Sequence, residues 1–188
     1  MFGSASINVN DLFDLSDRMA KGVNDNGVII NGAIIEGEIN DERLKNKALG
    51  INSHAEGSNT TASNVQAHAE GGGTTASGLQ SHAEGMDTTA SGEKSHAEGG
   101  WTIANHRSQH VFGELNIADP SSEPANNKGT YIEIVGNGTT FNARSNARTL
   151  DWDGNETLAG SLTLGKGTAD EVTITAATLK ALLSTISS

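Results

Sequence analysis

The chain has 188 residues, a formal net charge of −11 and no cysteine, which argues against nucleic-acid binding and excludes disulfides and thiolate chemistry. It is only 35% hydrophobic and 4% aromatic, with 23 glycines, so a conventional hydrophobic core would be small. We therefore expect the chain to bury additional surface by oligomerisation. No apolar run approaches the roughly 18 residues of a membrane span, and no secretory signal peptide is evident.

Residues 1–45 are expected to form an N-terminal attachment or leader segment with short strands. Asn10 and Asp11 could cap a short helix over residues 12–20, although a partly ordered tail fits this stretch equally well. Residues 27–39 are rich in β-branched side chains and are interrupted by glycine, which predicts strands with tight bends.

Residues 46–113 carry an internal repeat of fourteen residues. Its most regular part is the tetrapeptide His-Ala-Glu-Gly, which begins at His54, His68, His82 and His96. A second series, Thr-Thr-Ala-Ser, lies midway between the copies, so two related seven-residue units make one repeat. Self-similarity at a fixed period is typical of stacked architectures and shifts the functional question from catalysis to display.

A strand interpretation explains the repeat better than a helix. A glycine in every seven residues, together with many Ser and Thr residues, gives low helix propensity. In a strand, the Ser and Ala side chains face one way while His and Glu face the other. We therefore expect two short strands per coil, coils stacked at ~4.8 Å, and an interior that holds only Ala, Ser and Thr between two very close walls.

Residues 114–165 are expected to form a small C-terminal β module. Strands are predicted over residues 130–135, 148–152, 156–160 and 161–165, and Asp153-Gly154-Asn155 has the signature of a hairpin turn. Residues 166–188 should contain a last strand, a helix N-cap at Thr175 and a short terminal helix. The apolar face of that helix is formed by Leu179, Leu182, Leu183 and Ile186.

The paired seven-residue pattern resembles the head repeats of trimeric autotransporter adhesins (YadA-like heads). The His-Ala-Glu-Gly and Thr-Thr-Ala-Ser variant is similar to the version in bacteriophage tail-fibre and appendage proteins, as are residues 134–139 and 144–155, which follow the repeats. The resemblance covers residues 46–165 and implies a left-handed parallel β-roll assembled as a homotrimer. No neck, coiled-coil stalk or membrane anchor of the adhesins is recognisable, which favours a virion part over a cell-surface adhesin.

The same resemblance implies a subunit interface. In adhesin heads, apolar side chains at the outward positions of one strand series face the partner chains, whereas this chain has imidazoles and carboxylates there. Buried charges must be paired, so we expect His–Glu contacts between chains or through water; a solvated face is the alternative. The interface candidates are His54, Glu56, His68, Glu70, His82, Glu84, His96, Glu98 and, on the terminal helix, Leu179, Leu182, Leu183 and Ile186.

Metal binding is the other interpretation of the histidine column at His54, His68, His82, His96 and His110. A column arises automatically when a repeat is copied, so a structural role is favoured and no metal or other cofactor is expected. Asp151, Asp153 and Asn155 begin like a calcium loop, but Leu162 stands where the bidentate acid is required, and a hairpin turn is the better interpretation.

No nucleophile elbow, phosphate loop or zinc-protease motif is present, and no pair of carboxylates stands out, so we expect a protein without enzymatic activity. The expected function is a structural and host-adhesive rod of a phage or phage-like particle, made in the bacterial cytoplasm and located in the virion. Its expected partners are its own copies, other virion proteins through the N-terminal segment, and a host glycan or protein. A decoration without receptor binding and a polysaccharide-degrading spike are the alternatives.

Overall fold

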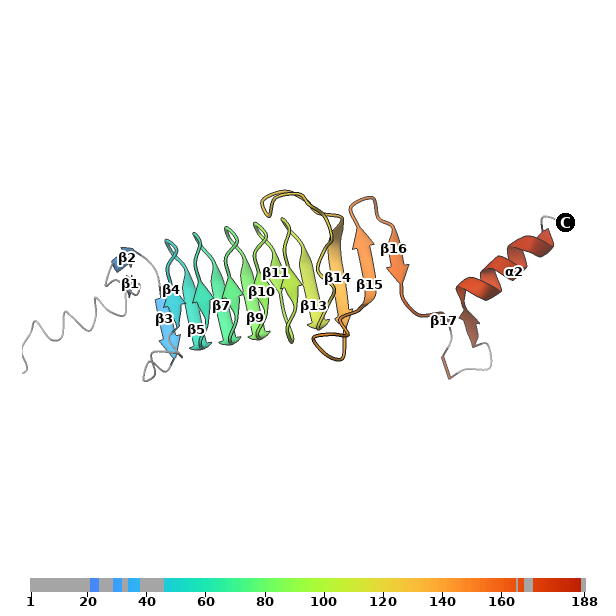
Figure 1. Cartoon of the computed structure of the whole chain (residues 1–188), viewed down its shortest axis with the longest axis horizontal. Helices are drawn as coiled ribbons and strands as arrows, with labels where there is room; N and C mark the ends of the chain where they lie inside the picture. Colours follow the sequence, from blue (N-terminus) through green and yellow to red (C-terminus); the bar gives the residue numbers. More distant parts are fainter. Residues whose placement is uncertain are drawn as a thin grey trace, which may run out of the picture.

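The structure, a computed structural model, describes residues 21–23, 29–31, 34–37, 46–164, 166–167 and 171–186. Within these ranges the chain consists mostly of β-strands, with one helix near the C-terminus, and the strands follow one another along the long axis of the molecule (Figure 1). The helix predicted over residues 12–20 lies outside the described residues.

The larger sheet has nine strands in the order β16-β15-β14-β13-β11-β9-β7-β5-β3. Neighbours from β3 to β14 are parallel, and β14, β15 and β16 pair antiparallel. The strands of this sheet are β3 (Ile34–Gly37), β5 (His54–Ser58), β7 (His68–Gly72), β9 (His82–Met86), β11 (His96–Ala97), β13 (His110–Glu114), β14 (Tyr131–Asn137), β15 (Asn146–Asp151) and β16 (Glu156–Leu158).

A second, five-stranded parallel sheet has the order β12-β10-β8-β6-β4. Its strands are β4 (Lys47–Ala48), β6 (Thr61–Ala62), β8 (Thr75–Ala76), β10 (Thr89–Ala90) and β12 (Ile103–Ala104). Two antiparallel pairs lie outside both sheets, together with the helix: β1 (Lys21–Val23) with β2 (Ile29–Asn31), β17 (Leu162–Leu164) with β18 (Val172–Ile174), and α2 (Ala176–Ile186).

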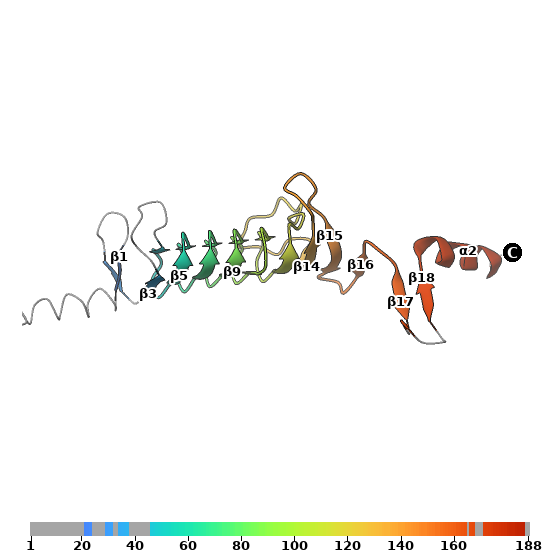
Figure 2. The ribbon, with the colours of Figure 1, turned by 90° about the horizontal axis from the view of Figure 1, so that it is seen from below.

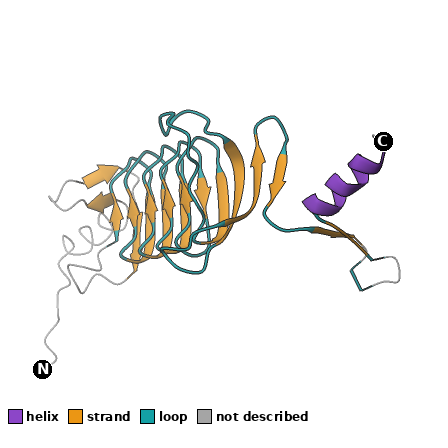
Figure 3. Ribbon diagram, turned by 45° about the vertical axis from the view of Figure 1, so that its right-hand side comes forward, coloured by secondary structure: helices purple, strands orange, loops and turns teal. Residues whose placement is uncertain are grey.

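Between β4 and β13 the chain alternates between the two sheets, so one strand from each makes a coil, and the coils stack in line (Figures 2 and 3). The register pairs His54 with His68 and Thr61 with Thr75, an offset of fourteen residues in both sheets. The predicted parallel β-solenoid is thereby confirmed, and its register fits the sequence repeat.

Between Ala48 and Ala104 the interior between the sheets is filled by side chains of one to three heavy atoms. A column of alanines comes from each sheet, and a Ser or Thr residue stands two residues before each alanine except Ala48 and Ala69, which follow Asn46 and Ala67. Between Ala48 and Ala104 this confirms the predicted inward set, whereas Asn46, Gln109 and Val111 are larger buried residues at the two ends of the repeat region. Small side chains explain how a chain so poor in large apolar residues can still form a closely packed core. The buried residues include Ala48, Ala55, Ala62, Ala69, Ala76, Ala83, Ala90, Ala97 and Ala104, with Ser53, Thr60, Thr74, Ser81, Thr88, Ser95 and Thr102.

Each turn of the coil uses backbone conformations with positive φ. After the His-Ala-Glu strand the glycine takes φ near 100°, as at Gly57 (103°) and Gly71 (102°). In the opposite turn of each coil a non-glycine residue has the positive φ, as at Gln66 (56°) and Gln80 (58°). A glycine recurs at the first of these turns in every copy of the tetrapeptide, whereas the residues at the second turn carry no comparable signal in the sequence.

A polar loop closes the five-stranded sheet at β12. The Asn116 side chain, fully buried, accepts a hydrogen bond from the Ile103 amide (2.8 Å) and donates one to the Ile103 carbonyl (3.1 Å). Asn116 thus forms the backbone hydrogen bonds that a further strand would form with Ile103, so this edge of the sheet is less open to pairing with another strand. Among the described residues, the larger sheet continues through β14 to β16 without a partner sheet.

The C-terminal elements follow the sequence predictions closely. The strands β15 and β16 pair across the turn at residues 152–155, which is the expected hairpin. The Thr175 hydroxyl accepts a hydrogen bond from the Thr178 amide (3.0 Å), so Thr175 is the helix N-cap. The helix α2 has no buried residue in the described chain, and it lies beyond β16, away from the two sheets, in Figure 1.

Candidate functional site: a histidine–glutamate ladder

Strand alternation places imidazoles and carboxylates on the outer face of the nine-stranded sheet. In each His-Ala-Glu strand the alanine is fully buried, whereas the flanking His and Glu are half-buried and point away from the interior. Because the register offset equals the sequence repeat, identical residues stand beside one another on successive strands. We call this surface the His–Glu ladder: His54, Glu56, His68, Glu70, His82, Glu84, His96, Glu98 and His110.

The five imidazoles form one continuous stack. Ring centroids of neighbouring histidines are 4.6, 4.5, 4.6 and 5.0 Å apart from His54 to His110, and the ring planes are within 14° of parallel. This spacing matches the distance between strands in a sheet, about 4.8 Å. The backbone register therefore imposes the stack.

The pairing of imidazole with carboxylate changes direction along the ladder. His54 and His68 face the glutamate of their own strand, with Nε2–Oε2 distances of 3.5 Å to Glu56 and 3.7 Å to Glu70. His96 faces Glu84 of the preceding strand at 3.2 Å. His82 stands between the two arrangements, and it forms no ion pair within the described part of the chain.

Burial and the contacts between neighbouring ladder residues shift the pKa values of three of them. Burial lowers the pKa of His68 and of His82 below the ordinary imidazole value, and the adjacent imidazoles lower it further. A hydrogen bond shared with the Glu70 carboxyl group raises the pKa of Glu84, and burial and Glu98 add to this effect. The centre of the ladder therefore favours neutral imidazoles.

The ladder ends where Phe112 takes the place of a glutamate. Its ring contacts His110, with centroids 5.2 Å apart, and His110 faces Glu98 of the preceding strand at 3.6 Å. The column of glutamates borders an open groove of about 510 Å³, which Phe112 also lines. The histidine column thus continues through β13, but the carboxylate column does not.

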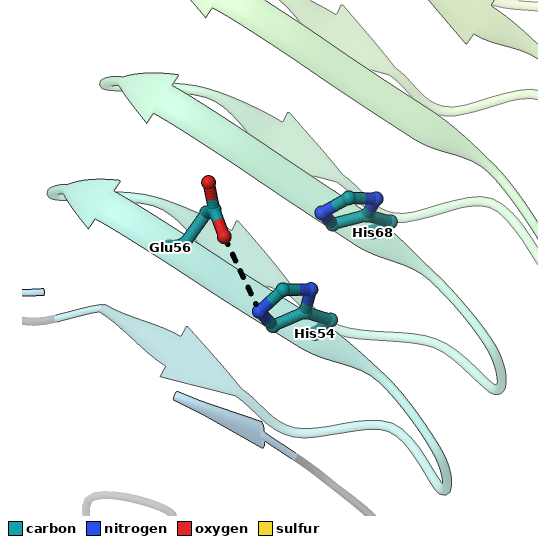
Figure 4. Close-up of side chains that lie close together, drawn as sticks. All are labelled: His54, Glu56 and His68. Atoms are coloured by element: carbon teal, nitrogen blue, oxygen red, sulfur yellow. Dashed lines mark ion pairs between the residues drawn. The ribbon is translucent and has the colours of Figure 1, made fainter. Parts of the chain in front are cut away.

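Three clusters within the ladder bring together ligand atoms suited to a metal ion. Each contains two histidines of neighbouring strands and one glutamate, with the three ligand atoms within 4.8 Å of one another. Figure 4 shows the first cluster, with Glu56 directed toward His54 and the His68 ring parallel to the His54 ring. His110, a fifth candidate from the sequence, belongs to none of them. The clusters are His54–Glu56–His68, His68–Glu70–His82 and His82–Glu84–His96.

The remaining predicted site residues lie elsewhere. Leu179, Leu182, Leu183 and Ile186 are on α2, separate from the ladder, and are 49–74% exposed. Asp151 accepts hydrogen bonds from the amides of Asp153 (2.9 Å) and Asn155 (2.8 Å) and from the Asn155 side chain (2.9 Å). These bonds lower the pKa of Asp151, the Asn155 side-chain bond most of all, and they are those of a closed hairpin turn.

Sequence reasoning missed a buried polar cluster beside β13. Gln109 donates to the Asp119 carboxylate (3.2 Å) and to the Tyr131 carbonyl (3.1 Å), and Asp119 also accepts from the Tyr131 amide (2.8 Å). These bonds fix the loop that leads into β14. The available signal was Gln109 itself, which stands at a position occupied by Ala or Ser in every preceding copy.

Comparison of this chain with family models, with curated proteins and with solved structures gives no match. None of the helices in the described ranges has the length and apolar character needed to cross a membrane.

Proposed function

We propose that this protein is a non-enzymatic, host-adhesive component of a bacteriophage or phage-like particle. It acts as a stiff homotrimeric display rod in a fibre, spike or appendage. The rod is the stacked coil, in which every strand between β4 and β13 is hydrogen-bonded to a neighbour in its sheet. Trimeric assembly and left-handed winding come from the resemblance of the repeats to adhesin heads and phage fibres.

The observation that carries this proposal is the exposure of the apolar side chains after β15. Leu158, Leu162, Leu164 and Val172 are 42–52% exposed, and Ile186 on α2 is 74% exposed. A single copy of the chain gives these side chains no core among its described residues. Covering these apolar side chains with another chain would remove them from water, which is energetically favourable. Their exposure therefore supports self-association of the chain.

The His–Glu ladder is the second proposed contact between chains. Its imidazole and carboxylate side chains are 30–43% exposed in one copy, so a partner could cover them without breaking the solenoid. Each chain carries imidazoles and carboxylates in alternation, and matching ladders would let four of the five imidazoles in each chain pair with a carboxylate of a partner. Residues 1–45 would then attach the rod to other virion proteins.

The first test is the mass of the full chain in solution. Sedimentation equilibrium should give three times 19.4 kDa, and a stable monomer would contradict the assembly. An antibody against the chain, imaged on whole phage particles by cryo-electron microscopy, should then label a fibre or appendage.

Adhesion is tested separately with fluorescently labelled protein and a panel of bacterial strains, measured by flow cytometry. Saturable binding to some strains without release of oligosaccharide supports the adhesive role. Particle labelling without binding to any strain would favour a decoration, and released oligosaccharide would favour a degrading spike.

A further inference from the structure

We propose that the outer face of the nine-stranded sheet binds divalent transition-metal ions. Zinc, nickel or copper(II) would be held between neighbouring strands by two imidazole nitrogens and one carboxylate oxygen. The inference concerns residues 54–96 of each chain. It requires this face to be open to ions, so it is an alternative to the contact between ladders proposed above, and it does not otherwise depend on the virion role.

The geometry brings the ligand atoms close to coordination distance. In each cluster they lie within 4.8 Å of one another, whereas ligands bound to one zinc ion at about 2.0–2.2 Å are roughly 3.4 Å apart. The stacked rings must therefore tilt toward one another. The His54 and His68 side chains are 30% and 35% exposed, so one side of each ring has room to turn while the backbone stays fixed.

The donor set selects the class of metal. Two imidazole nitrogens with one carboxylate suit zinc, nickel and copper(II), and the open face leaves further positions for water. Magnesium and calcium prefer sets made only of oxygen atoms, so they should compete poorly. The alternation of His and Glu on neighbouring strands supplies this set three times between His54 and His96.

The central imidazoles have nitrogens available for a metal. The Nε2 atoms of His68 and His82 are buried and form no hydrogen bond within the described chain. Metal ligation uses the neutral imidazole, whose unprotonated ring nitrogen provides the lone pair. A bound ion would give both buried nitrogens a coordination bond, in addition to the longer 3.7 Å contact between His68 Nε2 and Glu70.

Because neighbouring clusters share histidines, the number of metal ions that one chain can bind is limited. His68 belongs to the first and second clusters, and His82 to the second and third. One Nε2 atom binds one ion, so the second cluster cannot be filled together with either neighbour. The first and third clusters can be filled at once, and their ions would lie about 9.6 Å apart, with Glu70 between them to reduce the repulsion. The expected stoichiometry is two ions per chain.

The test uses the full chain, freed of metal with a chelator and titrated with zinc chloride near pH 7.5 by isothermal calorimetry. We expect two zinc ions per chain, a higher melting temperature with zinc and no such rise with magnesium. His68→Gln leaves only the third cluster and should bind one ion. His68→Gln/His82→Gln breaks all three clusters and should bind none.

A matched control lies on the same coils. The Gln66 and Gln80 side chains form their own ladder at another column, with a 2.9 Å hydrogen bond, so Gln66→Ala/Gln80→Ala should still bind two ions. Glu56→Gln/Glu84→Gln keeps every histidine but leaves only the second cluster complete, so the stoichiometry should fall from two ions to one. Absence of saturable zinc binding, or an unchanged stoichiometry in the double histidine variant, would overturn the proposal.

Discussion

Gly71 and Gly72 are adjacent in the chain, yet the fold demands a glycine at only one of them. Gly71 has φ of 102°, and a Cβ there would strike the carbonyl oxygen of Gly85 on the next coil. Nothing lies within 4 Å of a Cβ added to Gly72. The equivalent positions on neighbouring coils hold Ser58 and Met86, which shows that a side chain is accepted there.

We predict that Gly71→Ala lowers the free energy of unfolding by at least about 2 kcal/mol, because backbone strain and a steric clash act together. Gly72→Ala should change it by less than about 0.5 kcal/mol. Urea denaturation of both variants at equal protein concentration makes the comparison. Equal midpoints for the two variants would contradict the close approach of the coils at Gly71.

The protonation of His68 and His82 predicts a loss of stability in mild acid. Well above the ordinary imidazole pKa of 6.5, both rings are neutral in the folded and unfolded states and contribute no pH dependence. Below it, the unfolded chain takes up protons first because the pKa values of the folded state are lower. The free energy of unfolding should fall until the pH passes the lowered folded-state values.

Glu84 acts in the opposite direction at lower pH. Its pKa in the folded state is raised above the ordinary value of 4.5, so the folded chain binds this proton first and regains part of the stability as the pH falls through that window. Melting curves in chelator-containing buffer between about pH 8 and pH 4.5 should show the loss and then a partial recovery. The His68→Gln/His82→Gln variant should respond less, and a flat wild-type profile would indicate that the ladder is solvated.

At the scale of the element, the unit of this fold is one coil rather than one strand. Each coil contacts mainly its two neighbours. Removal of a whole coil should therefore remove the stabilisation of one contact between coils and leave the other contacts intact. Removal of half a coil would place each His-Ala-Glu strand after it in the position of a Thr-Thr-Ala strand. The column of imidazoles would then be divided between the two sheets.

We predict that deletion of residues 72–85, fourteen residues, leaves a folded β protein with a moderately lower melting temperature. Deletion of residues 72–78 should abolish cooperative unfolding, because β13 would no longer meet β14 in the larger sheet. Circular dichroism and thermal melting distinguish the two variants. Similar melting of both would mean that the seven-residue unit, and not the coil, is the cooperative element.

At the scale of the whole molecule, the exposed C-terminal helix should hold the copies together. Leu182 and Leu183 are 58% and 57% exposed, and Ser184 lies on the opposite side of the helix. Leu182→Asp/Leu183→Asp introduces two charges into the apolar face and should reduce the mass measured by sedimentation from that of the assembly toward that of one chain.

Ser184→Asp adds a charge outside that face and serves as the control, because it should leave the mass unchanged. Loss of assembly in the control as well would point to helix unfolding, and retention of assembly in both variants would assign the contact between chains to the solenoid.

The sequence alone determined the features that depend on local periodicity. Alternation of Ala with His and Glu placed the alanines inside and the ladder outside, and the fourteen-residue repeat predicted the register between coils. The hairpin around Gly154 and the N-cap at Thr175 followed from short turn and capping signals. Each is set by residues only a few positions apart, or by exact repetition, so it is visible without knowledge of the tertiary structure.

Tertiary structure decided the features made by residues that are distant in the sequence and not repeated. Asn116 completes the edge at Ile103, and Asp119 joins Gln109 to Tyr131, because a loop returns to the last coil. The reversal of His–Glu pairing around His82 depends on how side chains of successive strands pack. These contacts arise from the path of the chain in space, and the periodicity of the sequence carries no information about that path.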